Sequence, residues 1–240
     1  MLKYATIVIF ILLAVVFYYF SFAETDSSQI FLTVSTFLFA IFAGFFIARQ
    51  GSRYSQIRDQ ITTFDGEMSS TYRCFGHLSQ SSQEQVKKII TTHYQTIVEK
   101  KAWDYHFTHK SNTLTAINQL LHQETDKKNL KSLQHLAVQR ILVSLEKCQI
   151  ARKSMIALHQ ERIPKFQWIV IYILAIILLT TLSLIPSQHL LIASILKAAF
   201  ATLIFSVLIL LNNFDRLQFF EKTIGEKSAQ DILNIFSGKR

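Results

Sequence analysis

The stretch Ile30–Ala48 reads IFLTVSTFLFAIFAGFFIA, 19 residues without a charged side chain. An α-helix needs about 20 apolar residues to cross a hydrocarbon core of roughly 30 Å, so this stretch predicts a membrane-spanning helix. Three further stretches have the same character: Tyr4–Phe22, Phe166–Ile185 and Leu190–Leu211. The four together hold 80 of the 240 residues and one charge, Lys197, whereas the other 160 residues hold 40 of the 41 charges.

This uneven distribution of charge excludes several classes of protein. A soluble globular domain, a disulfide scaffold and a disordered chain do not concentrate their apolar residues in this way. Four buried core helices would need more surrounding protein than 240 residues provide. The apolar runs are continuous and do not alternate with period two, which also excludes barrel strands. We therefore predict an all-α integral membrane protein with four transmembrane helices in two hairpins flanking a cytoplasmic helical domain.

The basic residues predict the orientation of these helices, because Lys and Arg concentrate in cytoplasmic segments. Residues 49–165 carry 18 basic and 10 acidic side chains, whereas the links Ala23–Gln29 and Pro186–His189 carry no Lys or Arg. We expect a multi-pass protein of a bacterial inner membrane, with both termini in the cytoplasm. The expected partner is the lipid bilayer, whose surface accounts for the net charge of +9, and no nucleic acid partner is expected. The predicted segments are a first hairpin at 1–48, a cytoplasmic helical insert at 49–165, a second hairpin at 166–211 and a cytoplasmic amphipathic tail at 212–240.

The N-terminal apolar run has a second interpretation. Lys3, the apolar stretch and the small residues of Ser21-Phe22-Ala23 are compatible with a cleaved signal peptide. The run is long for a signal and ends in the aromatic residues 17–20, which suit a membrane interface. These features favour a retained span.

The insert has the apolar spacing of helices. Apolar residues three and four positions apart continue beyond the second span, so one helix is predicted from Ile30 to Phe75. Ser81 with Glu84 predicts the start of the next helix, and Ser111 the start of a short one. A short amphipathic helix is expected to begin near Ser228. A long last helix of the insert is expected to share one apolar face: Leu130, Leu133, Ala137, Ile141, Leu145, Cys148 and Met155.

Sequence motifs for catalysis are missing. The chain has no Gly-rich phosphate loop, no nucleophile elbow and no His-Glu-x-x-His pair, so we predict no catalytic residues, no cofactor and no enzyme. Cys74 and Cys148 are expected to be reduced thiols. His106 and His109 lie at helical spacing near Asp104, but a metal ion needs three or four ligands. We expect this pair to be solvated rather than a metal site, with a pH-sensing role as the alternative.

Lys197 is the one charge inside a predicted span, seven positions into the fourth. A charge in hydrocarbon costs about 2.5–3.5 kcal/mol on insertion scales, so it is a candidate functional residue that could contact an anion or a lipid headgroup. The alternative is that its long side chain packs between helices or reaches the outer interface.

A row of residues in the second span is the candidate pore lining. Phe37, Ile41 and Phe45 fall four residues apart, with Thr33 one turn earlier. In an oligomer such a stripe could form a hydrophobic gate that opens by wetting. The alternative is that these side chains pack on other spans or face lipid. Just beyond the span, Arg49, Arg53 and Arg58 are expected to contact anionic lipid headgroups, at about 1 kcal/mol for each charge.

The local sequence resembles the bestrophin-like family of bacterial membrane proteins. The resemblance covers about residues 30–105, together with the arrangement of two hairpins around a helical insert. It departs from the family where Lys101 and Ala102 separate Glu99 from Trp103. It also departs where residues 213–216 replace an Asp-Pro-Phe-x-Gly motif. The matching residues are Ala43–Ala48, Ser52-Arg53-Tyr54, Arg58, Glu67, Thr71-Tyr72-Arg73, Tyr94, Val98 and Trp103.

The resemblance implies a function that the residues alone do not. It implies an oligomeric ion channel, a pentamer selective for inorganic anions, with the second span lining the pore. The alternative hypothesis is a membrane scaffold or sensor whose helical insert binds a cytoplasmic partner.

Overall fold

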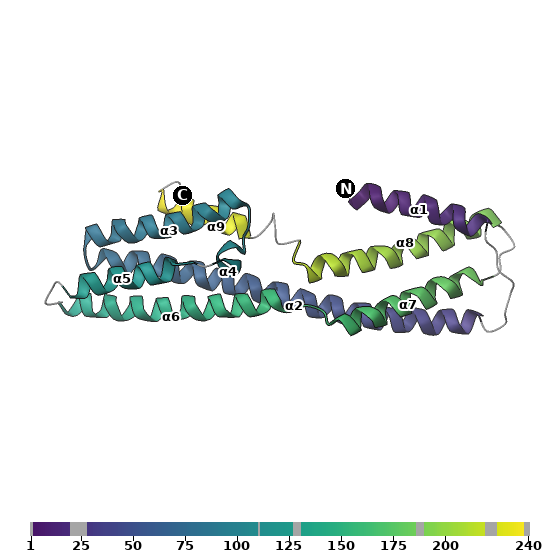
Figure 1. Cartoon of the computed structure of the whole chain (residues 1–240), viewed down its shortest axis with the longest axis horizontal. Helices are drawn as coiled ribbons and strands as arrows, with labels where there is room; N and C mark the ends of the chain where they lie inside the picture. The colour runs from purple at the N-terminus through teal and green to yellow at the C-terminus, as the bar shows by residue number, and fades with distance from the viewer. Residues whose placement is uncertain are drawn as a thin grey trace. The chain divides into compact units, whose positions relative to one another are not determined.

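The computed structural model describes residues 2–19, 28–109, 111–126, 131–185, 190–218 and 225–237, and within these residues it contains helices and no strand. The predicted links Ala23–Gln29 and Pro186–His189 lie largely or wholly outside this part of the chain. The helices are α1 (Leu2–Tyr19), α2 (Ser28–Gly76), α3 (Gln80–Lys100), α4 (Tyr105–Thr108), α5 (Thr113–Thr125), α6 (Ser132–Gln160), α7 (Lys165–Ser183), α8 (Leu190–Asp215) and α9 (Gly225–Phe236), as Figure 1 shows.

Helix α2 is the long helix that the sequence predicts. It runs for 49 residues from Ser28 to Gly76, continuing through Gly51 and Gly66. Its first part is uniformly apolar and its second part has a single apolar face. The chain divides into two compact units near this change in pattern, and α2 contributes to both.

Unit 1 comprises residues 1–51 and 162–216. Helix α1 packs along α8, and α8 also contacts α7 (Figure 1). Asp215 at the end of α8 accepts a hydrogen bond of 2.7 Å from the backbone N–H of Ile163, just before α7 begins. The core of unit 1 combines residues of α2, α7 and α8 with Ile163: Phe39, Ala43, Phe46, Ile163, Ile171, Ala175, Leu178, Ile204 and Leu211.

Three helices of the described chain are long and apolar enough to cross a membrane: α2, α7 and α8. In α1 the apolar stretch Phe10–Tyr19 is shorter than these three. The structure therefore supports a helical membrane protein. The span predicted at Tyr4–Phe22, most of which lies in α1, stays a prediction.

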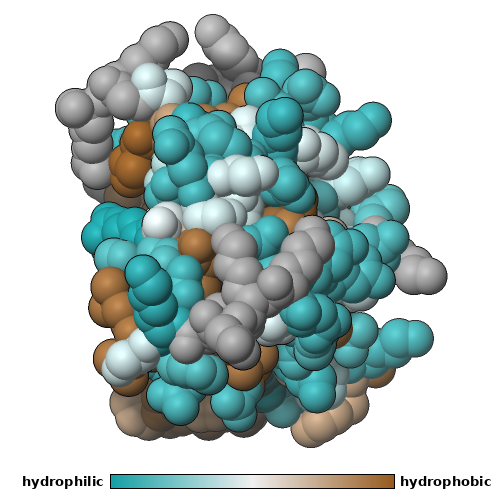
Figure 2. Space-filling model, turned by 90° about the vertical axis from the view of Figure 1, so that its left-hand side faces the viewer, coloured by the Kyte–Doolittle hydropathy of each residue, from teal (hydrophilic) through white to brown (hydrophobic). Residues whose placement is uncertain are grey.

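Unit 2 comprises residues 52–161 and 217–240. Helix α3 packs against α5 and α9, and α6 packs against α5 and α4. The end of the unit seen in Figure 2 is covered largely by hydrophilic side chains. Its core draws on α2, α3, α5, α6 and α9, and its fully buried members include Met68, Phe75, Val86, Ile90, Ile117, Ile141, Cys148 and Met155.

Two predicted helix starts are wrong, by two residues for α3 and by one for α5. Helix α3 is capped by Ser79 instead of Ser81, because the Ser79 hydroxyl accepts a 3.0 Å hydrogen bond from the Ser82 N–H. Helix α5 begins at Thr113 rather than after a cap at Ser111. Several hydroxyl side chains near each start can cap a helix, and tertiary contacts decide among them.

The C-terminal helix is part of unit 2. Helix α9 begins at Gly225, a little before the predicted start at Ser228, and it packs on α3. Ile232 and Phe236 are buried in the core of this unit. The amphipathic pattern of the tail therefore reflects packing inside the protein.

Candidate functional site

The predicted pore-lining stripe lies on an exposed face of α2. Phe37 is 66% exposed, Ile41 50% and Phe45 60%. Thr33 is also exposed, and its hydroxyl donates to a backbone carbonyl one turn earlier in α2. The four side chains therefore share a surface of unit 1.

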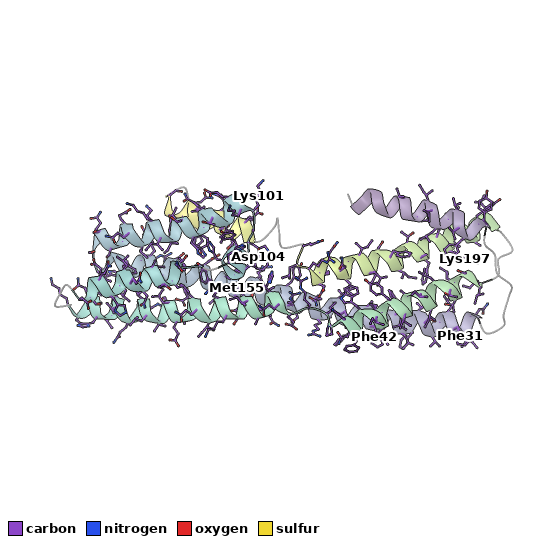
Figure 3. The ribbon with its side chains drawn as sticks, viewed as in Figure 1. Phe31, Phe42, Lys101, Asp104, Met155 and Lys197 are labelled. Atoms are coloured by element: carbon purple, nitrogen blue, oxygen red, sulfur yellow. The ribbon has the colours of Figure 1, made fainter. Side chains whose placement is uncertain are left out.

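The opposite face of α2 is buried. Phe39, Ala43 and Phe46 are each less than a tenth exposed, and they join the core formed with α7 and α8. Other exposed aromatic residues occur at the edge of the outward face, including Phe31 and Phe42, which Figure 3 labels. One side of α2 thus holds unit 1 together, while the other is available to lipid or to another copy of the chain.

Lys197 contacts the end of a neighbouring helix. It is half-buried, and its Nζ donates a hydrogen bond of 2.6 Å to the backbone carbonyl of Ile185, just after α7 (Figure 3). A cation near the C-terminal end of a helix is favourable because the last carbonyls carry partial negative charge. The amino group therefore links α8 to the end of α7, which is the kind of contact that the packing interpretation predicts.

The three predicted headgroup-binding arginines have different environments. Arg58 is exposed and Arg49 is half-buried. Arg53 is only 3% exposed. Its Nε and Nη2 donate hydrogen bonds of 2.6 Å and 2.9 Å to the carbonyls of Leu158 and His159, at the end of α6. The expected headgroup contact is therefore wrong for Arg53, whose charge instead stabilises the C-terminus of α6.

A buried carboxylate holds α9 against α2 and α3. Asp65 accepts a 2.6 Å hydrogen bond from the Tyr94 hydroxyl and a second one from the Ser228 hydroxyl. Burial and, next, the nearby charge of Asp65 raise the pKa of Tyr94 well above its usual value. The tyrosine is therefore a neutral donor at physiological pH.

Glu67 forms a second polar link, between α2 and α6. Its carboxylate accepts a 2.8 Å hydrogen bond from the fully buried Ser144 hydroxyl. It also pairs with Arg140 at 3.2 Å and Lys147 at 3.0 Å. Glu67 is one of the residues that carry the family resemblance, and in this chain it joins two long helices of unit 2.

The histidines are arranged differently from the prediction. His109 is exposed as expected, but His106 is buried and stacks on His93, with ring centroids 3.7 Å apart and planes inclined by 13°. Within the described residues no group of three or more His, Cys, Asp or Glu side chains is arranged to hold a metal ion. Cys74 and Cys148 are free thiols.

Sequence reasoning did not select His93, Asp65 or Asp215 as important residues. A buried acidic residue within the apolar face of a helix, such as Asp65 between Phe64 and Met68, is a signal that could have been used. The pairing of His93 with His106 has no sequence signal, because their spacing fits no single helix.

Together these features define a class: an all-α membrane protein with an apolar unit and a second unit that has a buried core and, at the end seen in Figure 2, a largely hydrophilic surface. The family model of the Bestrophin-like domain matches residues 3–217. The chain therefore belongs to the bestrophin-like family, which confirms the resemblance and extends it far beyond residues 30–105. No curated protein and no solved structure matched the chain.

Proposed function

We propose that this protein is an oligomeric ion channel for inorganic anions, with the stripe Thr33, Phe37, Ile41 and Phe45 facing the pore. The observation that carries the proposal is the exposure of this stripe on the face of α2 opposite to the core of unit 1. Membership of the bestrophin-like family supports it. An oligomer can enclose a water-filled path along such faces, whereas one four-span chain has little room for it.

The residues of the stripe have the chemistry of a gate. Phe37, Ile41 and Phe45 are large and apolar, and a narrow ring of such side chains excludes water until it widens. Such a constriction controls whether ions pass but offers no charge to select them. Smaller side chains in the ring are therefore expected to lower the barrier to conduction.

The proposed topology has four spans and cytoplasmic termini. Helix α1 has 18 residues and packs along α8, which supports its role as the first span. Unit 2 contains most of the segment with 18 basic and 10 acidic residues, which supports a cytoplasmic location. In a bacterial inner membrane both links would then face outward.

The surface of α6 supports assembly with further copies of the chain. Leu136, Val143 and Ile150 are 60%, 42% and 57% exposed, although the end of their unit seen in Figure 2 is largely hydrophilic. They lie seven residues apart, so they form one row along the helix, as at a helix–helix interface. A second copy of the chain would cover this row.

Ion flux from liposomes tests the proposal. Reconstituted protein should release chloride, and Phe37→Ala should increase the flux several-fold because it widens the constriction. Phe31→Ala is a matched control, since Phe31 is 60% exposed and lies about 120° from Phe37 around the axis of α2. No flux from the native protein, or equal changes in both variants, would contradict the proposed pore.

The oligomeric state in mild detergent tests the assembly separately. Val143→Glu should dissociate the oligomer, whereas Leu142→Glu should not, because neighbouring residues lie about 100° apart on a helix. Leu142 has similar exposure, 48%. A native protein that is monomeric or dimeric and conducts no ions would instead favour the scaffold or sensor hypothesis.

A further inference from the structure

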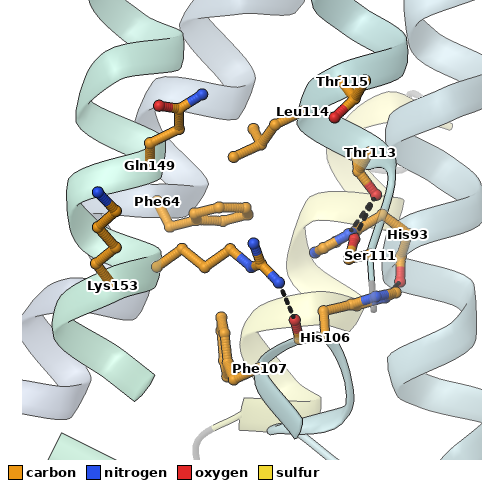
Figure 4. Close-up of a pocket in the computed structure, with 11 residues that line it drawn as sticks. Phe64, His93, His106, Phe107, Ser111, Thr113, Leu114, Thr115, Gln149 and Lys153 are labelled. Atoms are coloured by element: carbon orange, nitrogen blue, oxygen red, sulfur yellow. Dashed lines mark hydrogen bonds between the residues drawn. The ribbon is translucent and has the colours of Figure 1, made fainter. Parts of the chain in front are cut away.

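A cavity inside unit 2 is lined by the apolar side chains Phe64, Phe107 and Leu114 and otherwise by polar and cationic ones (Figure 4). It has a volume of about 160 Å³ and is bounded by residues of α2 to α6 and of the loop before α5. Gln149 and Lys153 of α6 lie on one side, and Ser111, Thr113 and His93 lie on the other. This volume is enough for several waters or one small polyatomic ligand.

Arg152 lines this cavity, and its guanidinium is only weakly paired with the protein. Its Nη2 makes only a 3.5 Å contact with the carbonyl of His106. Its Nε–H is buried and has no hydrogen-bond partner among the residues that the structure describes. A buried donor without a partner costs about 1–3 kcal/mol, and more when the group is charged. The site is therefore incomplete without an acceptor.

The wall opposite Arg152 also provides donors. Thr113, Leu114 and Thr115 are the first three residues of the 13-residue helix α5, and all three line the cavity. The residue before them, Asn112, makes no side-chain capping hydrogen bond. Its side chain therefore leaves the backbone N–H groups at this positive helix end unoccupied. The hydroxyls of Ser111 and Thr113 lie 3.1 Å apart beside it.

The electrostatic balance of the cavity is positive. Arg152 and Lys153 are cationic, and none of the described residues that line the cavity is acidic. Burial, and then the charges of His106 and Arg152, lower the pKa of His93 well below its usual value. Burial also lowers the pKa of His106, against the effect of its hydrogen bond to the His93 carbonyl. Both rings are therefore neutral at pH 7, and the cations set the charge.

We propose that this cavity binds a small oxyanion, a phosphate, sulfate or short carboxylate, between Arg152 and the N-terminal end of α5. An oxyanion offers several acceptors, so it can accept hydrogen bonds from the Arg152 guanidinium and from the Ser111 hydroxyl together. Its charge is favourable at an uncapped helix N-terminus. Bound there, it connects α6 to α5. This site lies within unit 2 and does not depend on ion conduction.

Thermal unfolding of the full chain in detergent tests the site, with sodium phosphate, sulfate or acetate replacing chloride at constant ionic strength. At least one of the three oxyanions should raise the midpoint saturably at millimolar concentration. Arg152→Gln should weaken its apparent affinity at least tenfold. Arg73→Gln is the control, because Arg73 is an exposed arginine of the same unit, outside the cavity.

Two further variants keep the test decisive if Arg152→Gln fails to fold. Lys153→Gln removes a second charge, and Thr113→Val removes a hydroxyl at nearly constant volume, so each should weaken binding several-fold. The proposal is wrong if none of the three oxyanions stabilises the native chain more than chloride. It is also wrong if Arg73→Gln reduces the affinity as much as the cavity variants do.

Discussion

Unit 1 and unit 2 are built from the same secondary structure but differ in where their large aromatic and aliphatic side chains lie. In unit 1, Phe37, Phe45 and Ile176 are 66%, 60% and 62% exposed. In unit 2, Phe75 and Ile141 are fully buried, and the face in Figure 2 is largely hydrophilic. Unit 2 therefore gains stability by removing apolar surface from water within one chain. Unit 1 needs an apolar environment or a second copy to do the same.

The polar contacts of the two units also differ. In unit 1 many hydroxyls, such as those of Thr36, Thr181 and Thr202, donate to carbonyls four residues earlier in their own helix. In unit 2 hydroxyls such as those of Thr71 and Thr92 do the same, and charged side chains such as Arg53 and Glu67 in addition join different helices. In a membrane, polar side chains are favoured when they form hydrogen bonds within their own helix. A water-exposed bundle also tolerates charged contacts between helices at its edges.

The largest expected difference between the units concerns their phenylalanines. Phe75→Ala in unit 2 should lower the free energy of unfolding by about 3–5 kcal/mol, because it leaves a cavity in the core. Phe31→Ala in unit 1 should change it by less than about 0.5 kcal/mol, since Phe31 is exposed. Unfolding of both variants in the same detergent, followed by circular dichroism, measures the difference. Equal losses would show that α2 is buried on both faces.

The arginines near the boundary provide the next comparison. Arg53→Gln should cost about 1.5–3 kcal/mol of stability, because hydrogen bonds from a charged donor to the end of α6 are lost. Arg58→Gln removes an exposed charge and should stay within about 0.5 kcal/mol of the native protein. Thermal unfolding midpoints of the two variants distinguish them. A larger loss for Arg58→Gln would contradict the burial of Arg53.

Glu67 tests the charged link inside unit 2. Glu67→Ala should cost about 1–3 kcal/mol, because the fully buried Ser144 hydroxyl loses its acceptor. Glu67→Gln keeps an acceptor and loses only the pairing with two partly exposed cations, so it should cost about 1 kcal/mol or less. If denaturant unfolding gave both variants the same stability, the ion pairs rather than the hydrogen bond would be responsible.

The buried histidines predict a pH dependence confined to unit 2. The pKa of His93 is lowered in the folded state, so below the unfolded value near 6.5 the unfolded chain binds more protons. The contribution of His93 to stability is therefore fully present well above pH 6.5 and is lost as the pH falls through this value, by about 1.4 kcal/mol at pH 5.5. Unfolding of native protein and of His93→Gln from pH 7.5 to 5.5 measures the effect. A native slope no steeper than that of the variant would contradict it.

The sequence predicts those parts of the fold that depend on local pattern. The apolar run at Ile30–Ala48 and the regular spacing beyond it are sufficient to predict the whole of α2, to within two residues at each end. The length of the apolar runs predicts a helical membrane protein, and short motifs identify the family. The sequence does not determine which residue caps α3, because Ser79, Ser81 and Ser82 can each cap a helix.

Contacts between distant segments could not be predicted in this way. Arg53 contacts carbonyls more than 100 positions away, and Ser228 contacts Asp65 across 163 positions. The family pattern marks Arg53 and Glu67 without indicating their partners. His106 was expected to be solvated because its spacing to His109 suggested one exposed face. In the fold His106 is buried and stacks on His93, which belongs to another helix.

Chemical accessibility of the α2 stripe tests the central claim most directly. In a Cys74→Ser background, Phe37→Cys and Phe31→Cys each introduce one reactive thiol. Cys148 can remain, because burial raises its pKa to about 12 and the protonated thiol is unreactive. In liposomes, a charged thiol reagent that does not cross the bilayer should modify Phe37→Cys and reduce its ion flux, and leave Phe31→Cys unchanged. Faster modification of Phe31→Cys, or no modification at Phe37→Cys, would contradict a pore lined by this face of α2.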